Sequence, residues 1–357
     1  MSPQGRPLLK PFLVGAGVVG GAILVFLLFS LLRDQALHPR AAQILEQPPT
    51  GVDAQHPIHL WIEKDAGWAE SRCDTTADCL AHLQDAEPIA EAEYLSFLIA
   101  LEDPRPFSIV RPGGGLADAD PLMYATRQLA LHIARDPDAY PPDLLRRVVS
   151  ANRHWLATAT TLMDKMMATA AMNALIDATR HVERAAPMPL FARSELSMRK
   201  TYEGEMRFAR RVLRTGDTPG SNIVMKPNYT MNLIYAQMEH LSAASERQGC
   251  DFWRKTPSFS WSGWHRLLNP AGEVLAMVAE PAYSSYGSEV ARLNLRIALT
   301  NAYNQQADPS AWQSPLECWQ SRYLEASSEL CLVPVAELAG EVMRLCLPYQ
   351  LEKLEGS

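Results

Sequence analysis

The sequence predicts an all-α fold, in which an N-terminal transmembrane helix precedes a large multi-helix domain stapled by disulfides. Three observations support this prediction. Residues 12–32 contain no charged side chain. Apolar residues recur at i, i+3 and i+4 over much of the remaining chain, which is the spacing of an amphipathic helix. All six cysteines lie beyond the uncharged run.

The uncharged run is long enough to cross a membrane. Its 21 residues, at about 1.5 Å each, match the roughly 30 Å hydrocarbon core of a bilayer. Lys10 and Arg33 bound the run, and the residues after it offer no small-residue cleavage site. A cleaved signal has a shorter apolar region and such a site, so we expect a retained anchor. Residues 1–11 are then a cytoplasmic tail, although Lys and Arg nearly balance on the two flanks.

The cysteines indicate that the bulk of the chain lies in an oxidising compartment. The predicted disulfide residues are Cys73, Cys79, Cys250, Cys318, Cys331 and Cys346. We expect Cys73 to pair with Cys79. The other four allow three pairings, of which we favour Cys318 with Cys331 and Cys250 with Cys346. The alternative is that the cysteines are small buried apolar residues in a reduced domain. Their spacing does not predict a metal site, since the chain has no Cys-x-x-Cys pair.

The first half of the chain predicts a stalk and then a helical half. Residues 33–60 are punctuated by prolines and predict the stalk, and residues 61–214 predict the helical half. Asp120-Pro121 is a typical helix start, with a capping acid before proline. The expected helices cover 89–101, 120–136, 142–184 and 194–213.

The second half also predicts a series of helices. The helix breaker at 215–220 separates it from the first, so we expect a second helical half at 221–350. Its expected helices cover 228–248, 270–279, 288–305, 309–325 and 334–345. An aromatic-rich connector occupies 251–268.

Two stretches of the second half resemble a known set of proteins. They are Lys226-Pro227-Asn228-Tyr229-Thr230-Met231-Asn232-Leu233-Ile234-Tyr235, and Asn269-Pro270-Ala271-Gly272-Glu273-Val274-Leu275 followed by Ala279-Glu280-Pro281-Ala282-Tyr283. Together they resemble uncharacterised bacterial single-pass inner-membrane proteins with a large helical periplasmic domain, over about residues 190–300. The resemblance implies the bacterial inner membrane as location and a helical fold, and it supplies no catalytic residues. Taken by themselves, Asn228 and Asn269 suit helix caps.

Four aromatic residues of the connector form the strongest candidate binding site: Trp253, Phe259, Trp261 and Trp264. Flat apolar rings in a loop can line a groove for a ligand or protein partner. They can equally form a small core beneath the connector. In the apolar run, Gly17 and Gly21 have the spacing of a helix-association motif, or are simply glycines of the kind common in membrane helices.

The basic residues at 193–214 allow three interpretations. This predicted helix can meet lipid phosphates or an acidic partner, or it can neutralise the acidic residues at 63–103 within the same fold. His56 and His59 are closely spaced in a predicted loop before a short apolar run and could bind a metal. We nevertheless expect no metal and no cofactor.

Composition excludes nucleic-acid binding as a main activity, because the formal charge is −7 and the pI is about 5.8. The chain has no His-Glu-x-x-His or Gly-x-Ser-x-Gly motif. We therefore expect a membrane-anchored envelope protein that acts by binding or assembly. Its expected partners are the lipid bilayer, a second copy through the transmembrane helix, and an envelope protein. The alternative is a membrane-anchored periplasmic enzyme acting on cell-envelope components, with catalytic residues unknown.

Overall fold

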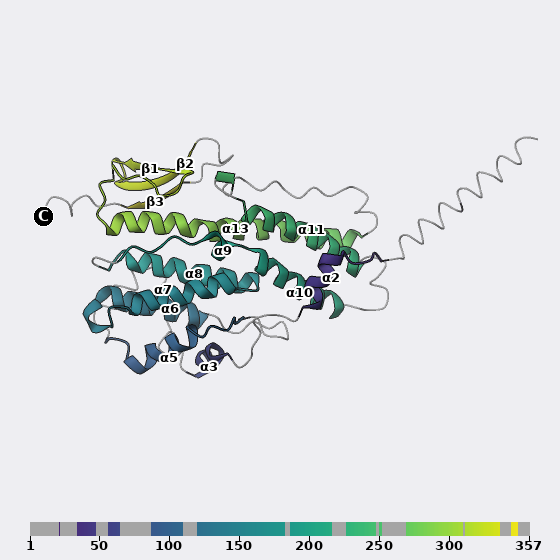
Figure 1. The fold of residues 1–357 in the computed structure, drawn as a ribbon, viewed down its shortest axis with the longest axis horizontal. Coiled ribbons are helices and arrows are strands. Elements are labelled where there is room, and N and C mark those ends of the chain that lie inside the picture. The colour runs from purple at the N-terminus through teal and green to yellow at the C-terminus, as the bar shows by residue number, and fades with distance from the viewer. Residues whose placement is uncertain are drawn as a thin grey trace, which may run out of the picture.

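The structure, a computed structural model, describes residues 34–47, 56–64, 87–109, 120–182, 186–215, 226–247, 250–251, 269–309, 311–335 and 344–348, together with Gly21. They form an elongated helical body with a small sheet on one side (Figure 1). The helices are α2 (Pro39–Glu46), α3 (Pro57–Lys64), α5 (Glu91–Leu101), α6 (Asp120–Arg135), α7 (Leu144–Thr158), α8 (Leu162–Thr179), α9 (Arg193–Leu196), α10 (Arg199–Thr215), α11 (Pro227–Ser245) and α13 (Pro270–Asn304).

Helix α8 lies at the centre of the body. It packs against α6, α7, α10 and α13, and several of its small and branched side chains are fully buried, among them Ala168, Ala171 and Leu175. The sequence predicted a single helix over 142–184, which is wrong, because the chain breaks between α7 and α8. Thr161 caps α8 there by accepting a hydrogen bond from Asp164 N at 3.1 Å.

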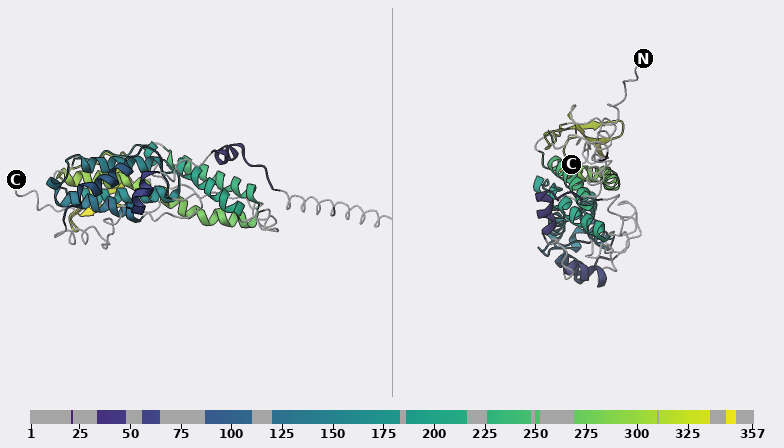
Figure 2. Two further views of the ribbon diagram at one scale, coloured as in Figure 1. Left: turned by 90° about the horizontal axis from the view of Figure 1, so that it is seen from below. Right: turned by 90° about the vertical axis from the view of Figure 1, so that its right-hand side faces the viewer.

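Helices α10 and α11 lie toward one end of the body, and α13 extends from α11 along the body to the sheet (Figures 1 and 2). Helix α13 is a single helix of 35 residues, so the prediction of two helices at 270–279 and 288–305 is wrong. The helix continues through Pro281 and Gly287 and packs against α8 and α11. Helix α13 ends where Gln306 adopts a positive φ of 50° and Ala307 N bonds to Ala302 O at 3.1 Å.

One hydrophobic core joins residues from most of these elements. It runs from Ala41 and Ile44 of α2 to Val290 and Ile297 of α13, so it includes residues from both predicted helical halves. The segment predicted as a stalk is therefore packed on the body over α2. The predicted seam at 216–220 lies outside the described residues.

The all-α prediction is wrong for the C-terminal part, although it holds for the bulk of the body. Strands β1 (Trp319–Leu324), β2 (Glu329–Pro334) and β3 (Leu345–Pro348) form an antiparallel sheet in the order β1-β2-β3. Helices had been expected at 309–325 and 334–345. The strands are short, and the Leu-rich β2 has no alternating pattern because Leu330, Cys331 and Leu332 are all buried.

The predicted transmembrane helix at 12–32 lies outside the described residues, except for Gly21. Gly21 is helical and exposed. Among the helices that the structure does describe, none has the length and apolar character needed to cross a membrane.

Candidate functional site

Asp34, the second residue after the apolar run, caps the first turn of α11. Its carboxylate accepts hydrogen bonds from Asn228 N at 2.8 Å and from Tyr229 N at 3.0 Å. The first N–H groups of a helix lack partners within the helix and carry partial positive charge, so a carboxylate stabilises them. The prediction that Asn228 caps α11 is wrong. Lys226 occupies the cap position, where its side chain does not cap the helix, and Asp34 supplies the cap from 194 residues away.

The residues that follow Asp34 are bound along the same face of α11. The Asn232 side chain accepts a hydrogen bond from His38 N at 2.8 Å and donates one to Ala36 O at 2.9 Å. One turn further on, the His38 ring stacks on Tyr235 with 4.8 Å between centroids. Asn228, Asn232 and Tyr235 lie at i, i+4 and i+7 and so share one face of the helix. Residues 34–38 are therefore fixed to α11 by backbone and ring contacts.

A buried polar cluster ties the start of α11 to the start of α13. Asn269, fully buried, accepts a hydrogen bond from Lys226 N at 2.9 Å and donates one to Thr230 Oγ1 at 2.9 Å. Thr230 in turn donates to Lys226 O at 2.9 Å. Asn269 occupies the cap position of α13 as predicted, but its side chain binds α11 and not its own helix. The two stretches that carried the family resemblance thus meet in space.

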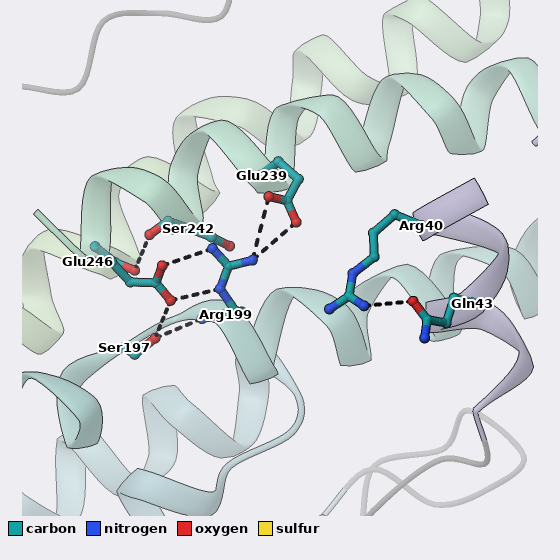
Figure 3. A network of polar contacts seen from close by, with 8 residues as sticks. Arg40, Gln43, Ser197, Arg199, Glu239, Ser242 and Glu246 are labelled. Atoms are coloured by element: carbon teal, nitrogen blue, oxygen red, sulfur yellow. Dashed lines mark hydrogen bonds and ion pairs between the residues drawn. The ribbon is translucent and has the colours of Figure 1, made fainter. Parts of the chain in front are cut away.

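Ion pairs join the start of α10 to the far end of α11 (Figure 3). Arg199 donates to Glu246 at 2.7 and 2.8 Å and to Glu239 at 3.2 Å. These contacts raise the pKa of Arg199, and the same guanidinium lowers the pKa of Glu246. Because the start of α10 meets the end of α11, the two helices run antiparallel, and α10 ends beside the Asp34 junction.

Helix α10 also binds α2. Arg207 Nε donates to Ile44 O at 3.0 Å and its Nη2 donates to Gln47 at 3.1 Å. The expectation that the basic helix neutralises the acidic residues at 63–103 therefore fails for Arg199 and Arg207. Their partners are the carboxylates of α11 and the end of α2.

Lys165 is a buried amine with a lowered pKa, a feature that active-site lysines often share, but its contacts are structural. Its side chain is 1% exposed, and burial lowers its pKa to about 7. Nζ donates to Leu156 O at 2.8 Å and to Glu195 O at 2.7 Å, which are carbonyls in the last turns of α7 and α9. A cation there satisfies carbonyls that have no partner within their helices.

Asp164 has a matching structural role at the start of α8. Burial raises its pKa, while hydrogen bonds from its neighbours oppose that shift. The carboxylate accepts from Ile109 N at 2.8 Å and from Thr161 Oγ1 at 2.6 Å. The side chains of Lys165 and Asp164 therefore both form hydrogen bonds within the fold.

The paired histidines do not form a metal site in the described chain. His56 caps α3 by accepting from Ile58 N on Nδ1, at 3.2 Å, so its Nε2 donates to Arg105 O at 3.1 Å. Both ring nitrogens are used. The cluster of Glu329, Cys331 and Cys346 has the proximity of metal ligands, but its two sulfurs are bonded to each other.

The disulfides confirm covalent stapling but not the favoured pairing. The bonds are Cys250–Cys318 and Cys331–Cys346, so the predicted Cys318–Cys331 and Cys250–Cys346 pairs are wrong. The strand register explains this result, because Cys331 lies directly opposite Cys346 on β3. Cys318 precedes β1 and lies near the end of β2, at Val335 N, and reaches Cys250 just after α11.

The remaining predicted sites lie outside the described residues. They are the aromatic connector residues Trp253, Phe259, Trp261 and Trp264, the cysteine pair Cys73 and Cys79, and Gly17. An added Cβ at Gly21 would have no heavy atom within 4 Å. Self-association through Gly17 and Gly21 remains a prediction. The Asp34 junction was not predicted from the sequence.

These observations define the class of protein as a helical body with a disulfide-bonded antiparallel sheet, in which residues 34–47 are bound to α10 and α11. Comparison of the chain with protein-family models, with curated proteins and with solved structures found no match.

Replacing Asp34 tests the junction. Asp34→Ala is expected to lower the free energy of unfolding by about 1–2 kcal/mol, since it removes the cap of α11. It should also speed hydrogen exchange at the amides of Asn228 and Tyr229. Asp34→Asn keeps an acceptor oxygen and is the matched control, with a smaller loss. Unchanged exchange at both amides in Asp34→Ala would show that the cap contributes nothing.

Proposed function

We propose that this chain is a single-pass, membrane-anchored envelope protein that acts by binding or assembly, with its body in the periplasm. The observation that carries the proposal is the attachment of Asp34 to α11, because it couples the body directly to the end of the apolar run. Asp34 follows Leu32 by two residues, which span at most about 7 Å. If 12–32 crosses the bilayer, the body is held against the membrane surface and not on a flexible tether.

The disulfides support the location. Cys318 and Cys331 are buried, and each is bonded to a cysteine distant in sequence. Stable disulfides of this kind are typical of secreted and periplasmic domains and rare in the cytosol.

The use of the buried charges supports binding over catalysis. Lys165, Asp164 and His56 each hold backbone groups of neighbouring elements, as described above. A catalytic acid, base or nucleophile needs a polar atom that can reach the substrate. These three groups instead bind backbone groups of the fold, so the candidate for interaction is the surface of the elongated body.

A reporter fusion tests location and orientation. Alkaline phosphatase fused after Gly51 is expected to be active in cells, because it needs an oxidising compartment to form its own disulfides. The full chain should remain in the membrane after carbonate washing. An inactive fusion, with a cytoplasmic reporter active at the same site, would overturn the proposed orientation.

Variants of the full chain test binding. Trp261→Ala with Trp264→Ala is expected to abolish recovery of a crosslinked envelope partner and to leave the melting temperature nearly unchanged. A stability loss of about 3–5 kcal/mol would instead assign these side chains to a core. Partner recovery equal to that of the wild type, at equal stability, would exclude the connector as the binding site.

A further inference from the structure

We propose that Cys331 and Cys346, once their bond is reduced by a dithiol, form a zinc site with Glu329 as the third protein ligand. The site is closed while the two sulfurs are bonded to each other, as they are in this structure. Reduction of one disulfide would then open a binding site on the sheet. This inference does not depend on the proposed membrane anchor.

The three side chains lie together on one face of the sheet. Cys331 of β2 lies directly opposite Cys346 of β3, and Glu329 precedes Cys331 by two residues on β2. Residues two apart on a strand share a face. The ligand atoms, two sulfurs and a carboxylate oxygen, all lie within 4.8 Å of one another. The paired strands therefore already hold the ligands of a single metal ion close together.

This face lies opposite the hydrophobic cluster between the sheet and α13. Leu330 and Leu332, the neighbours of Cys331 on β2, belong to that cluster. Side chains alternate between the two faces of a strand, so Cys331 lies on the other face. Arg322, directly opposite Cys331 on β1, is exposed there. Cys331 is buried and Cys346 is half-buried, so Cys346 is the more accessible half of the disulfide.

The second disulfide has apolar surroundings. Cys318 is 2% exposed, and both Cys318 and Cys250 pack with the hydrophobic cluster. Exposed disulfides are the more easily reduced, and apolar surroundings disfavour the thiolate that reduction produces. A dithiol is therefore expected to open Cys331–Cys346 first, while Cys250–Cys318 still joins the start of the sheet to the end of α11.

Reduction converts the disulfide into two thiols. A thiolate of the dithiol attacks the Cys346 sulfur, the bond to Cys331 breaks, and Cys331 leaves as a thiolate on the same face as the Arg322 guanidinium. The second thiol of the dithiol then displaces Cys346. Both electrons come from the dithiol, which becomes a disulfide. A metal ion that binds both sulfurs releases their remaining protons to solvent.

The ligand set selects the metal. Thiolates favour zinc over magnesium and calcium, which prefer oxygen ligands. Zinc takes four ligands, and a site with three protein ligands leaves the fourth position for water. Ser327 Oγ donates to Glu329 Oε2 at 2.8 Å and so orients the carboxylate. Two thiolates and a carboxylate exceed the charge of the ion by one, and Arg322 lies on the same face to balance it.

Thiol mapping of the full chain tests the reduction step. The chain is equilibrated with increasing dithiothreitol, alkylated, and mapped by mass spectrometry. Cys331 and Cys346 are expected to be labelled at a concentration about tenfold lower than Cys250 and Cys318. Labelling of all four together, or of Cys250 and Cys318 first, would overturn the proposal.

Cobalt binding tests the metal site, because cobalt(II) is a coloured substitute for zinc. The full chain, reduced with a phosphine, is expected to gain a thiolate-to-cobalt charge-transfer band that added zinc abolishes. The oxidised chain should show no such band. Cys331→Ala with Cys346→Ala should bind one zinc ion fewer than the reduced wild type, which separates this site from metal held by other cysteines.

Glu329→Gln isolates the carboxylate. It is expected to weaken the zinc affinity of the reduced chain about tenfold or more, since it removes a charged ligand and leaves both sulfurs. Glu325→Gln is the matched control, because Glu325 is an exposed acid of the same hairpin, and it should leave the affinity unchanged. Zinc affinity in Glu329→Gln equal to that of the wild type would overturn the assignment. So would a reduced chain without the cobalt band, including one in which reduction has separated β3 from β2.

Discussion

Gly204→Ala is expected to lower the free energy of unfolding by about 3 kcal/mol or more, although glycine to alanine within an open helix usually stabilises by about 1 kcal/mol. Gly204 lies in the middle of α10. A Cβ at this position would lie 1.5 Å from Thr160 O and 2.7 Å from Thr160 C. Those atoms are backbone, so no side-chain rotation can relieve the clash.

The chain that the Cβ would meet is also fixed in place. Thr160 lies in the break between α7 and α8, where Thr201 Oγ1 donates to Ala159 O at 3.1 Å. Lys165 holds Leu156 O in the same region, at 2.8 Å. Moving α10 away by the required distance would break the first bond and open the core around Tyr202 and Met206, which are 2% and 1% exposed. The steric clash and the loss of core contacts therefore both lower the stability of the variant.

Gly287→Ala is the matched control, because Gly287 also lies within a helix. The nearest heavy atom to its added Cβ is Tyr202 Oη at 3.9 Å, an ordinary contact distance. This change is expected to stabilise the protein by up to about 1 kcal/mol. Urea unfolding of both variants measures the difference. Equal stabilities for the two would show that α10 does not approach the α7–α8 break this closely.

Helices with strong local signals could be predicted from the sequence. Helix α6 begins at Asp120 and α11 begins at Pro227, within a residue of their expected starts, because proline and capping residues mark such positions. Boundaries decided by tertiary contacts could not be predicted. The α7–α8 break lies against Gly204 of α10, and Lys165 of α8 binds Leu156 O beside it. Helix α13 continues through Pro281.

The junction at Asp34 shows why the candidate site was missed. Its partners are 194 and 195 residues away in sequence, and a single carboxylate after a basic residue has no distinguishing pattern. Both Asn228 and Asn269 were expected to cap helices, and only Asn269 occupies a cap position. Their roles depend on which segment lies beside them, which only the fold determines. The cysteine pairing was missed for the same reason, because the register between β2 and β3 sets it and the sheet itself was not predicted.

Removing the Cys250–Cys318 bond is expected to lower the free energy of unfolding by about 4 kcal/mol, and removing Cys331–Cys346 by about 3 kcal/mol. In the chain-entropy account, a disulfide stabilises by restricting the unfolded chain, and longer closed loops gain more. The sequence separations are 68 and 15 residues. Alanine is the suitable replacement because Cys318 and Cys331 are 2% and 0% exposed, and serine would bury a hydroxyl group.

The location of the loss distinguishes a disulfide effect from general damage. The sheet and the end of α13 form a hydrophobic cluster that includes Leu299, Trp319 and Leu330, separate from the main core. Cys250→Ala with Cys318→Ala should therefore speed hydrogen exchange first in β1 and β2, while the buried amides of α8 stay protected until global unfolding. Dithiothreitol should reproduce this pattern in the wild type and have less effect on the variant. Unfolding curves of the wild type that do not move with dithiothreitol would contradict both disulfide predictions, because the restriction on the unfolded chain would then contribute nothing to stability.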